Sequence, residues 1–430
     1  MQKKHDNKKI LVITHQLSRT GAPIVLLDMV RVYKNQGYKI DVITMLDGEL
    51  RENLEEMGIS VRVQERFIDQ AEEFYQFAGN YDMVIANTLI TYEVIHILNQ
   101  SEIPVLWWLH EGKQYFEYFA SVLPDFHKLS SNIHVFSVGY YVQQVMSELY
   151  GYETEILPFG VEDVPISGLK NAFAQSGENK VKFLTAGTYS KVKAQDVLAE
   201  AIRMLPEEYL SQAEFYFCGN EQMYDEEVYG PVQQLCEEYE NVTMIAQLPH
   251  QEMLKQMEVC DCLIVPSRID PVPAVAVEMM MKENPCLCTE VCGIAHYIED
   301  GVNGFTVPVE DAKALKDKIE EIIDQRDKLT LIGEKGREIY DKYFSKKVFE
   351  PRVKTIAEKY MYPEDTEMKE LAKCVLEIEK ETEQGTLLSE EEQQGVENSI
   401  RLVMEYIMCN YECGEETGED FLKIIRKFAK

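Results

Sequence analysis

Short apolar runs rich in β-branched residues alternate with helical patterns along most of the chain. In the first part such runs predict strands at residues 9–14, 38–44, 81–86, 104–109 and 134–138. Continuous apolar strands that alternate with helices predict a parallel sheet covered on both faces. After the first strand comes the polar loop His15–Pro23. We expect Pro23 to begin a helix that Gly37 stops after Gln36, because proline is favoured at the first helical position.

The alternation pauses at Leu157–Val161 and at a polar stretch from Ser167 to Lys180. We place the linker between two domains there, because turn residues gather and the composition changes. The alternation then restarts, with strands predicted at residues 182–186, 214–218, 242–245 and 261–265. The sequence therefore predicts an α/β protein of two successive doubly wound domains, with the cleft between them as the default ligand site.

From about Pro363 the chain becomes acidic, and we expect no further strand. Three amphipathic helical stretches are predicted instead, at Met368–Glu381, Val396–Tyr411 and Asp420–Lys430. We expect this tail to pack on its own domain with its charges outward. The alternative is a partner-binding module.

Length and charge narrow the classes of function. The 430 residues favour two or three domains, and the formal net charge of −32 argues against a protein that binds nucleic acid or anionic lipid through basic clusters. The first apolar run, Ile10–Ile13, is too short for a signal sequence, and no run approaches the roughly 20 apolar residues of a membrane span. We expect a cytoplasmic protein with at most peripheral membrane contact.

The cysteines first occur at Cys218, which is unlike a secreted disulfide framework. Five of the ten form the group Cys260, Cys262, Cys286, Cys288 and Cys292. These could form a metal or redox site, but no histidine stands at zinc-ligand spacing beside them. We therefore favour small apolar residues in buried strands and expect no metal site.

Two candidate ligand loops belong to the first domain. The loop from His15 to Pro23 lies between a strand and a helix N-terminus, and Gly21 would let it approach a phosphate closely; an ordinary turn is equally compatible. His110 follows a strand and would face the crevice, or else cap the next helix.

A third candidate loop begins the second domain. Gly187 ends a strand, and Lys191 and Lys193 precede a helix, so the two lysines could neutralise a pyrophosphate. Alternatively, both lysines are solvated and Asp196 is an ordinary helix cap.

Two carboxylates complete the set of candidates. Asp270 precedes two prolines, and Glu278 lies inside the apolar helix that follows. A buried carboxylate requires hydrogen-bond donors, which a ligand rich in hydroxyl groups would supply. In the alternative, Asp270 and Pro271 start the helix as a cap, and Glu278 pairs with Lys282 one turn later on its surface.

Read together, these motifs resemble the retaining glycosyltransferases of family 4, which have the GT-B fold. The resemblance covers about residues 8 to 360. It rests on a conserved order that this chain repeats as Gly187, Lys193–Asp196, Pro266–Ser267, Asp270 with Glu278, Gly293 and Asp300–Gly304. Asp270 stands where the family has a glutamate, and Ala194 where it has a glycine.

The resemblance implies a role for each candidate. Glu278 would accept hydrogen bonds from the ribose of the donor, Asp270 would contact its sugar, and Lys193 would bind its pyrophosphate. His110 would lie near the transferred sugar. Phosphate would also meet the loop at Gly21, with Lys191 and Gly187 nearby, and the start of the helix at Val272, Pro273 and Ala274.

The resemblance also implies an organisation of the chain. Residues 1–165 would form the acceptor-side Rossmann-like domain and 166–345 the domain that binds the nucleotide-sugar. Residues 346–362 would form a helix that crosses back, and 363–430 an acidic helical extension.

The implied activity is that of a hexosyltransferase, which transfers sugar from a nucleotide-sugar to a glycan, lipid-linked or protein acceptor in surface polysaccharide assembly. We expect it to need neither a metal nor a cofactor, because the chain lacks the Asp-x-Asp element of the other major glycosyltransferase fold. Two alternatives stay open: a GT-B partner subunit without turnover and a nucleotide-sugar epimerase.

Overall fold

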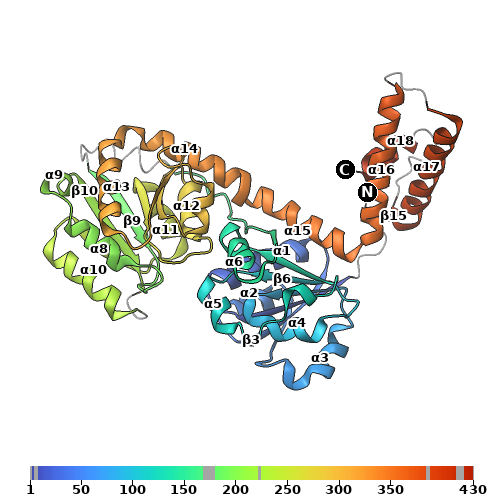
Figure 1. Ribbon diagram of the computed structural model, residues 1–430, viewed down its shortest axis with the longest axis horizontal. Coiled ribbons are helices and arrows are strands. Elements are labelled where there is room, and N and C mark those ends of the chain that lie inside the picture. The colour runs from blue at the N-terminus through green and yellow to red at the C-terminus, as the bar shows by residue number, and fades with distance from the viewer. Residues whose placement is uncertain are drawn as a thin grey trace.

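Two parallel sheets, each covered by helices on both faces, make up most of the molecule (Figure 1). The computed structural model describes residues 2–3, 8–167, 180–220, 224–383, 388–412 and 421–429. Most of the polar stretch in which we expected the domain linker, residues 168–179, therefore lies outside the described residues, as do the two ends of the last predicted helix.

The first sheet has seven strands in the order β4-β3-β2-β5-β6-β7-β8. They are β2 (Lys9–Gln16), β3 (Lys39–Leu46), β4 (Ser60–Val63), β5 (Met83–Asn87), β6 (Val105–Leu109), β7 (Ile133–Ser137) and β8 (Glu155–Ile156). The helices around it are α1 (Gly21–Asn35), α2 (Leu50–Glu56), α3 (Ala71–Ala78), α4 (Tyr92–Leu98), α5 (Lys113–Phe119) and α6 (Tyr140–Tyr150). The strand order reverses between β2 and β5, so the loops after these strands part there and leave a crevice.

The second sheet repeats this plan with six strands in the order β11-β10-β9-β12-β13-β14. They are β9 (Val181–Ala186), β10 (Ala213–Gly219), β11 (Val242–Ala246), β12 (Cys262–Val265), β13 (Cys286–Thr289) and β14 (Phe305–Val307). Its helices are α8 (Gln195–Arg203), α9 (Glu207–Leu210), α10 (Glu226–Glu238), α11 (His250–Val259), α12 (Ala274–Met281), α13 (Ala312–Asp324) and α14 (Leu329–Ile339). The reversal falls between β9 and β12, from which the loops of Lys193 and Asp270 depart.

All nine predicted strands are present, and the five clustered cysteines are buried in or beside the second sheet. The predictions missed three edge strands of the two sheets, β4, β8 and β14. Strand β4 has only four residues, of which one is even half-buried, so its polar–apolar alternation is too short to distinguish it from a loop.

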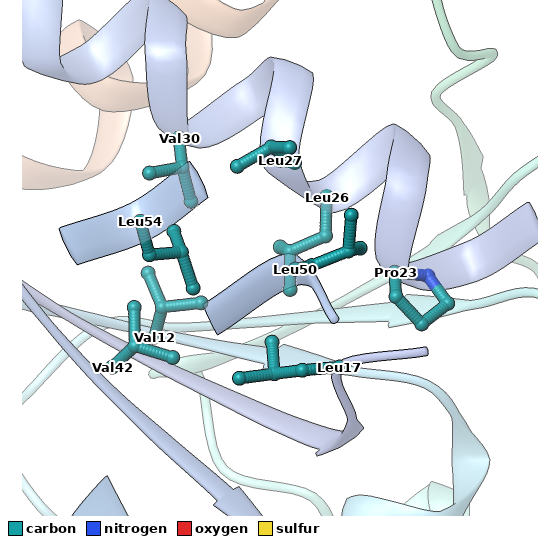
Figure 2. Close-up of a pocket in the computed structure, with 9 residues that line it drawn as sticks. All are labelled: Val12, Leu17, Pro23, Leu26, Leu27, Val30, Val42, Leu50 and Leu54. Atoms are coloured by element: carbon teal, nitrogen blue, oxygen red, sulfur yellow. The ribbon is translucent and has the colours of Figure 1, made fainter. Parts of the chain in front are cut away.

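Helix α1 begins at Gly21, so the prediction that Pro23 is its first residue is wrong by two positions. Pro23 instead lies in the first turn, whose N–H groups have no acceptor within the helix in any case. The helix places Pro23, Leu26 and Val30 against the sheet and α2 (Figure 2). The apolar gap between these elements is only about 10 Å³, so this part of the core is closed to ligands.

The chain passes between the domains twice, and the two crossings are hydrogen-bonded to each other. The N–H of Val161 donates to the carbonyl of Phe344 at 2.7 Å, and the N–H of Lys346 donates back to Val161 at 3.2 Å. Helix α15 (Lys346–Met361) then runs from the second domain onto the first (Figure 1), where Phe349 stacks near Trp108.

Beyond α15 stand three further helices, α16 (Pro363–Glu383), α17 (Glu390–Asn410) and α18 (Phe421–Phe428). They enclose a small core of their own that includes Val403, Ile407 and Phe428. They project away from the first sheet domain (Figure 1), so the expectation that this tail packs on a sheet domain is wrong. The expectation of no strand after Pro363 is also wrong, because a two-residue strand, β15 (Tyr411–Glu412), pairs with β1 (Gln2–Lys3).

Within the described residues, no helix has both the length and the apolar content that crossing a bilayer requires.

Lys282 anchors the first crossing to the second domain from a buried position. Its Nζ donates to the carbonyls of Val164 and Pro165 at 3.2 and 3.0 Å and lies 3.6 Å from the buried carboxylate of Glu258. The alternative in which Lys282 pairs with Glu278 on the helix surface is therefore wrong.

We predict that Lys282→Ala lowers the free energy of unfolding by about 3 kcal/mol, because it leaves the Glu258 carboxylate buried without this cation. Urea denaturation of the full chain measures the effect. Lys313→Ala is the matched control, because Lys313 pairs with Asp317 on the surface and should change the same quantity by less than about 0.5 kcal/mol. Equal effects of the two substitutions would contradict the anchoring role.

Candidate active site

The loops after β9 and β12 meet at a buried ion pair. Nζ of Lys193 lies 2.6 Å from Oδ2 of Asp270, and the Asp270 side chain is almost fully buried. Burial alone would lower the pKa of Lys193, but the Asp270 carboxylate outweighs it and the pKa is raised. Lys193 is therefore a fixed cation at the edge of the second sheet.

Arg268 fastens the same two loops a second time. Its guanidinium donates to both carboxylate oxygens of Asp196, at 2.8 and 3.1 Å, and to the carbonyl of Lys191 at 2.7 Å. Asp196 is thus a partner of Arg268 and not the expected helix cap, a position that Ala194 occupies. Nζ of Lys191 instead pairs with Glu227 at the surface, so the structure does not bring Lys191 to Lys193.

The backbone conformation of Gly187, beside the Lys193 side chain, is one that residues with a Cβ rarely adopt. Its φ is +149°, and a Cβ there would lie 3.8 Å from the Lys193 stem. Gly21, by contrast, has no left-handed φ, and a Cβ there would meet no atom within 4 Å. The position is open, so the close approach of a phosphate to Gly21 stays a prediction.

Asp270 does not cap the helix that follows it, because α12 begins only at Ala274. The carbonyl of Asp270 instead accepts from the N–H of Gly293 at 2.8 Å, which holds the loop in place. The first-turn N–H groups of α12 have no acceptor in the helix itself and could meet an anion. Pro273 has no N–H, so of the three residues expected to meet phosphate only Val272 and Ala274 could donate from the backbone.

Glu278 is half-buried, with 13% of its side chain exposed. Its Oε1 lies 2.7 Å from Nε2 of His250, the first residue of α11, whose own side chain is 67% exposed. The hydrogen bond and charge of Glu278 raise the pKa of His250. Glu278 is therefore a half-buried carboxylate with one removable partner.

On the other side of the cleft, three loops of the first domain enclose a cavity of about 270 Å³. These loops follow β2, β5 and β6, and the residues that line the cavity include His15 at the end of β2, Thr88 and His110. Val192, Ile269 and Pro271 close it from the second domain. The structure therefore places His110 in a cavity between the domains, where we expected it.

Two histidines in this wall are kept neutral. Burial and the neighbouring His15 lower the pKa of His110 to about 3, and burial lowers that of His15 to about 4. Nε2 of His110 is buried and has no hydrogen-bond partner in the described part of the chain.

The domains touch tightly beside this cavity. A Cβ on Gly112 would lie 2.6 Å from Cγ2 of Ile269, and one on Gly139 would lie 2.8 Å from Cγ2 of Val272. Both distances are shorter than a side chain tolerates, so glycine at these two positions permits the present approach of the domains.

Two family models match the chain. One, described as Glycosyl transferases group 1, matches residues 170–339, and the other, described as Glycosyl-transferase family 4, matches residues 6–151. The chain belongs to the group 1 glycosyltransferases of family 4. An uncharacterized glycosyltransferase of Methanocaldococcus jannaschii is 28% identical over 169 residues, which make up 37% of this chain and 43% of that protein. The match thus spans less than half the length of this relative.

Solved structures agree on the fold of this glycosyltransferase. Anabaena HepE in complex with UDP and glucose matches with a TM-score of 0.67 and 20% identity, over 82% of this chain and 100% of that one. Sucrose-phosphate synthase of Thermosynechococcus elongatus matches with a TM-score of 0.64 and 16% identity, over 82% and 99%. Identities this low concern the fold alone, and the expected GT-B fold with a C-terminal helical extension is confirmed.

Several residues of this site escaped the sequence analysis. Thr88 and Glu111 are polar residues just beyond the ends of buried strands, and this position could have identified them as residues of the site. For Arg268 and His250 the sequence offered none, because their importance lies in partners 72 and 28 positions away. Glu111 accepts from the N–H groups of Leu89 and His110 at 2.8 and 2.9 Å and so joins two of the loops around the cavity.

Thr88 has a backbone conformation, φ +82° and ψ 158°, that is almost confined to glycine. It is held there by several contacts: its carbonyl accepts from Trp107 Nε1 at 2.9 Å, its N–H donates to Trp108 at 2.8 Å, and its hydroxyl lies 3.1 Å from Nδ1 of His15.

We predict that Thr88→Gly is more stable than Thr88→Ala by about 1 kcal/mol, because only the glycine relieves the backbone strain. Urea denaturation of both variants tests this. The same pair at Thr44, which is buried in β3 without a positive φ, should show the ordinary order, with alanine more stable by about 0.5–1 kcal/mol. The same order at both sites would refute strain at Thr88.

Proposed function

We propose that this chain is a retaining glycosyltransferase that moves a sugar from a nucleotide-sugar to a glycan or glycolipid acceptor in the assembly of surface polysaccharides or other glycoconjugates, in the cytoplasm. The observation that carries the proposal is the buried ion pair of the fixed cation Lys193 with Asp270 at the edge of the second sheet, with a further carboxylate, Glu278, on helix α12, which follows Asp270. A dissociating nucleoside diphosphate needs positive charge, and a sugar and a ribose need hydrogen-bond acceptors. The solved structure of Anabaena HepE, which shares the fold, is a complex with UDP and glucose.

In this proposal Lys193 and the first turn of α12 receive the diphosphate. Negative charge grows on the leaving oxygen as the bond to the sugar breaks, and a cation already in place stabilises it without reorganisation. Lys193 supplies this charge, so the proposed reaction needs no metal. Asp270, displaced from Lys193 by the diphosphate, turns to the hydroxyl groups of the transferred sugar.

Glu278 receives the ribose hydroxyls in this scheme. The ligand to use is the nucleotide among UDP, GDP and ADP that raises the melting temperature of the wild type. We predict that Glu278→Gln weakens the binding of this nucleotide by about 10- to 100-fold, because hydrogen bonds to a charged acceptor contribute about 1.5–3 kcal/mol. Thermal shift followed by calorimetry measures this. Glu200→Gln, an exposed change on α8, is the control and should bind as the wild type does. Unchanged affinity of Glu278→Gln would remove the ribose role.

Before a nucleotide-sugar binds, His250 is hydrogen-bonded to Glu278, the carboxylate that would receive the ribose. Because its pKa is raised in the folded protein, the charged pair is fully formed below about pH 6.5 and is lost as the pH rises through that raised value. We predict that the affinity for the nucleotide-sugar rises several-fold from pH 6 to pH 8.5 and that His250→Ala flattens this dependence. Calorimetry with UDP-glucose, or with the GDP- or ADP-sugar that the thermal shift selects, measures it. A steep profile in His250→Ala would contradict the competition.

Turnover distinguishes the proposal from its alternatives. With the nucleotide-sugar supplied, a transferase releases nucleoside diphosphate slowly even without acceptor. A partner subunit without catalysis would release none, and an epimerase would return an isomerised nucleotide-sugar.

A further inference from the structure

We propose that the cavity between the domains takes the reacting end of the acceptor as an uncharged, hydroxyl-bearing sugar ring and excludes rings that carry phosphate or carboxylate. The inference rests on the proposed function and adds the chemical class of the acceptor to it.

Composition of the cavity wall is the first argument. Fourteen described residues line it, and none of them is lysine or arginine. Its two histidines, His15 and His110, stay neutral at physiological pH because burial lowers both pKa values. An anion that enters a cavity without a cation loses part of its hydration and gains no opposite charge in return.

The unpartnered polar atoms of the wall are the second argument. Nε2 of His110 and Oε1 of Gln114 are both buried, line the cavity and have no hydrogen-bond partner within the described residues. A hydroxyl group can both donate and accept, so it can satisfy either atom. A phosphate or carboxylate oxygen only accepts, and it would face the Gln114 carbonyl oxygen without a proton between them.

Glu111 reinforces this preference from inside the wall. Burial raises the pKa of its carboxyl group to about 7, against the opposing hydrogen bonds from His110 and Leu89. The group is therefore neutral or negative, never positive, and it adds nothing that would attract an anion. The cation of the site, Lys193, lies across the cleft, where it pairs with Asp270 and, in the proposed reaction, receives the diphosphate.

Size and shape also fit a single ring. At about 270 Å³ the cavity is at the small end of ligand sites, which range from about 300 to 1,000 Å³. Tyr115 stands in its wall with 46% of the residue exposed, and a tyrosine presents an apolar face together with a polar tip. The carbon-bound hydrogens of a neutral sugar ring can pack on such a face.

Transfer of radiolabelled sugar from the nucleotide-sugar to matched acceptors tests the proposal, with the chain of 430 residues as the enzyme. The panel pairs each neutral aryl hexoside with its 6-phosphate and its uronic acid, and nucleotide release without acceptor is measured alongside. We expect label on one or more neutral hexosides, with kcat/KM at least tenfold lower for their charged counterparts. Equal or faster transfer to a charged member would overturn the proposal, as would nucleotide release without label on any neutral hexoside.

A charge placed in the wall gives a second readout. Ile90 is half-buried and lines the cavity, so Ile90→Arg should narrow the neutral-to-charged ratio of kcat/KM at least fivefold. Val63→Arg, on the exposed face of edge strand β4, is the control and should leave the ratio as in the wild type. A folded Ile90→Arg that releases nucleotide but keeps the wild-type ratio would overturn the inference. If the wild type neither binds nor releases nucleotide, the proposed function itself fails, which is a separate result.

Discussion

The contact between Lys193 and Asp270 is the interaction on which the proposed donor site depends. Each of these charges is largely withdrawn from water, and each is tolerated because the other neutralises it. Arg268 and Asp196 tie the same two loops together nearer the surface. Because both pairs fasten the same two loops, we expect the effects of changing them on activity to be coupled and not additive.

Charge and neutrality are divided between the two sides of the cleft. The second domain supplies Lys193 and the start of α12, and the first supplies neutral imidazoles and hydroxyl groups. This division matches the two halves of a transfer reaction, because a nucleotide-sugar is anionic and a sugar acceptor need not be. The strained backbone at Thr88 belongs to the neutral side, where it holds one hydroxyl group against His15.

The sequence was informative wherever one local rule decides the outcome. Apolar strands set both sheets, and residues after strand ends, such as His110 and Lys193, necessarily came to the cleft. Prediction from the sequence failed where a side chain pairs with one of several possible partners that are distant along the chain. Lys191 turned to Glu227 and Lys282 to Glu258, and neither spacing nor residue type distinguishes these partners from the expected ones. The positive φ of Thr88 was equally hidden, because a threonine gives no sign of a conformation that tertiary contacts impose.

The paired crossings between the domains have a mechanical consequence. Since Val161 is hydrogen-bonded to Phe344 and Lys346, the two connecting segments form a single ribbon at one edge of the interface. If the cleft widens, we therefore expect the two domains to rotate about these paired segments as a hinge. Gly112 and Gly139 lie where the two domains touch most closely, so a larger residue at either position would keep the domains farther apart.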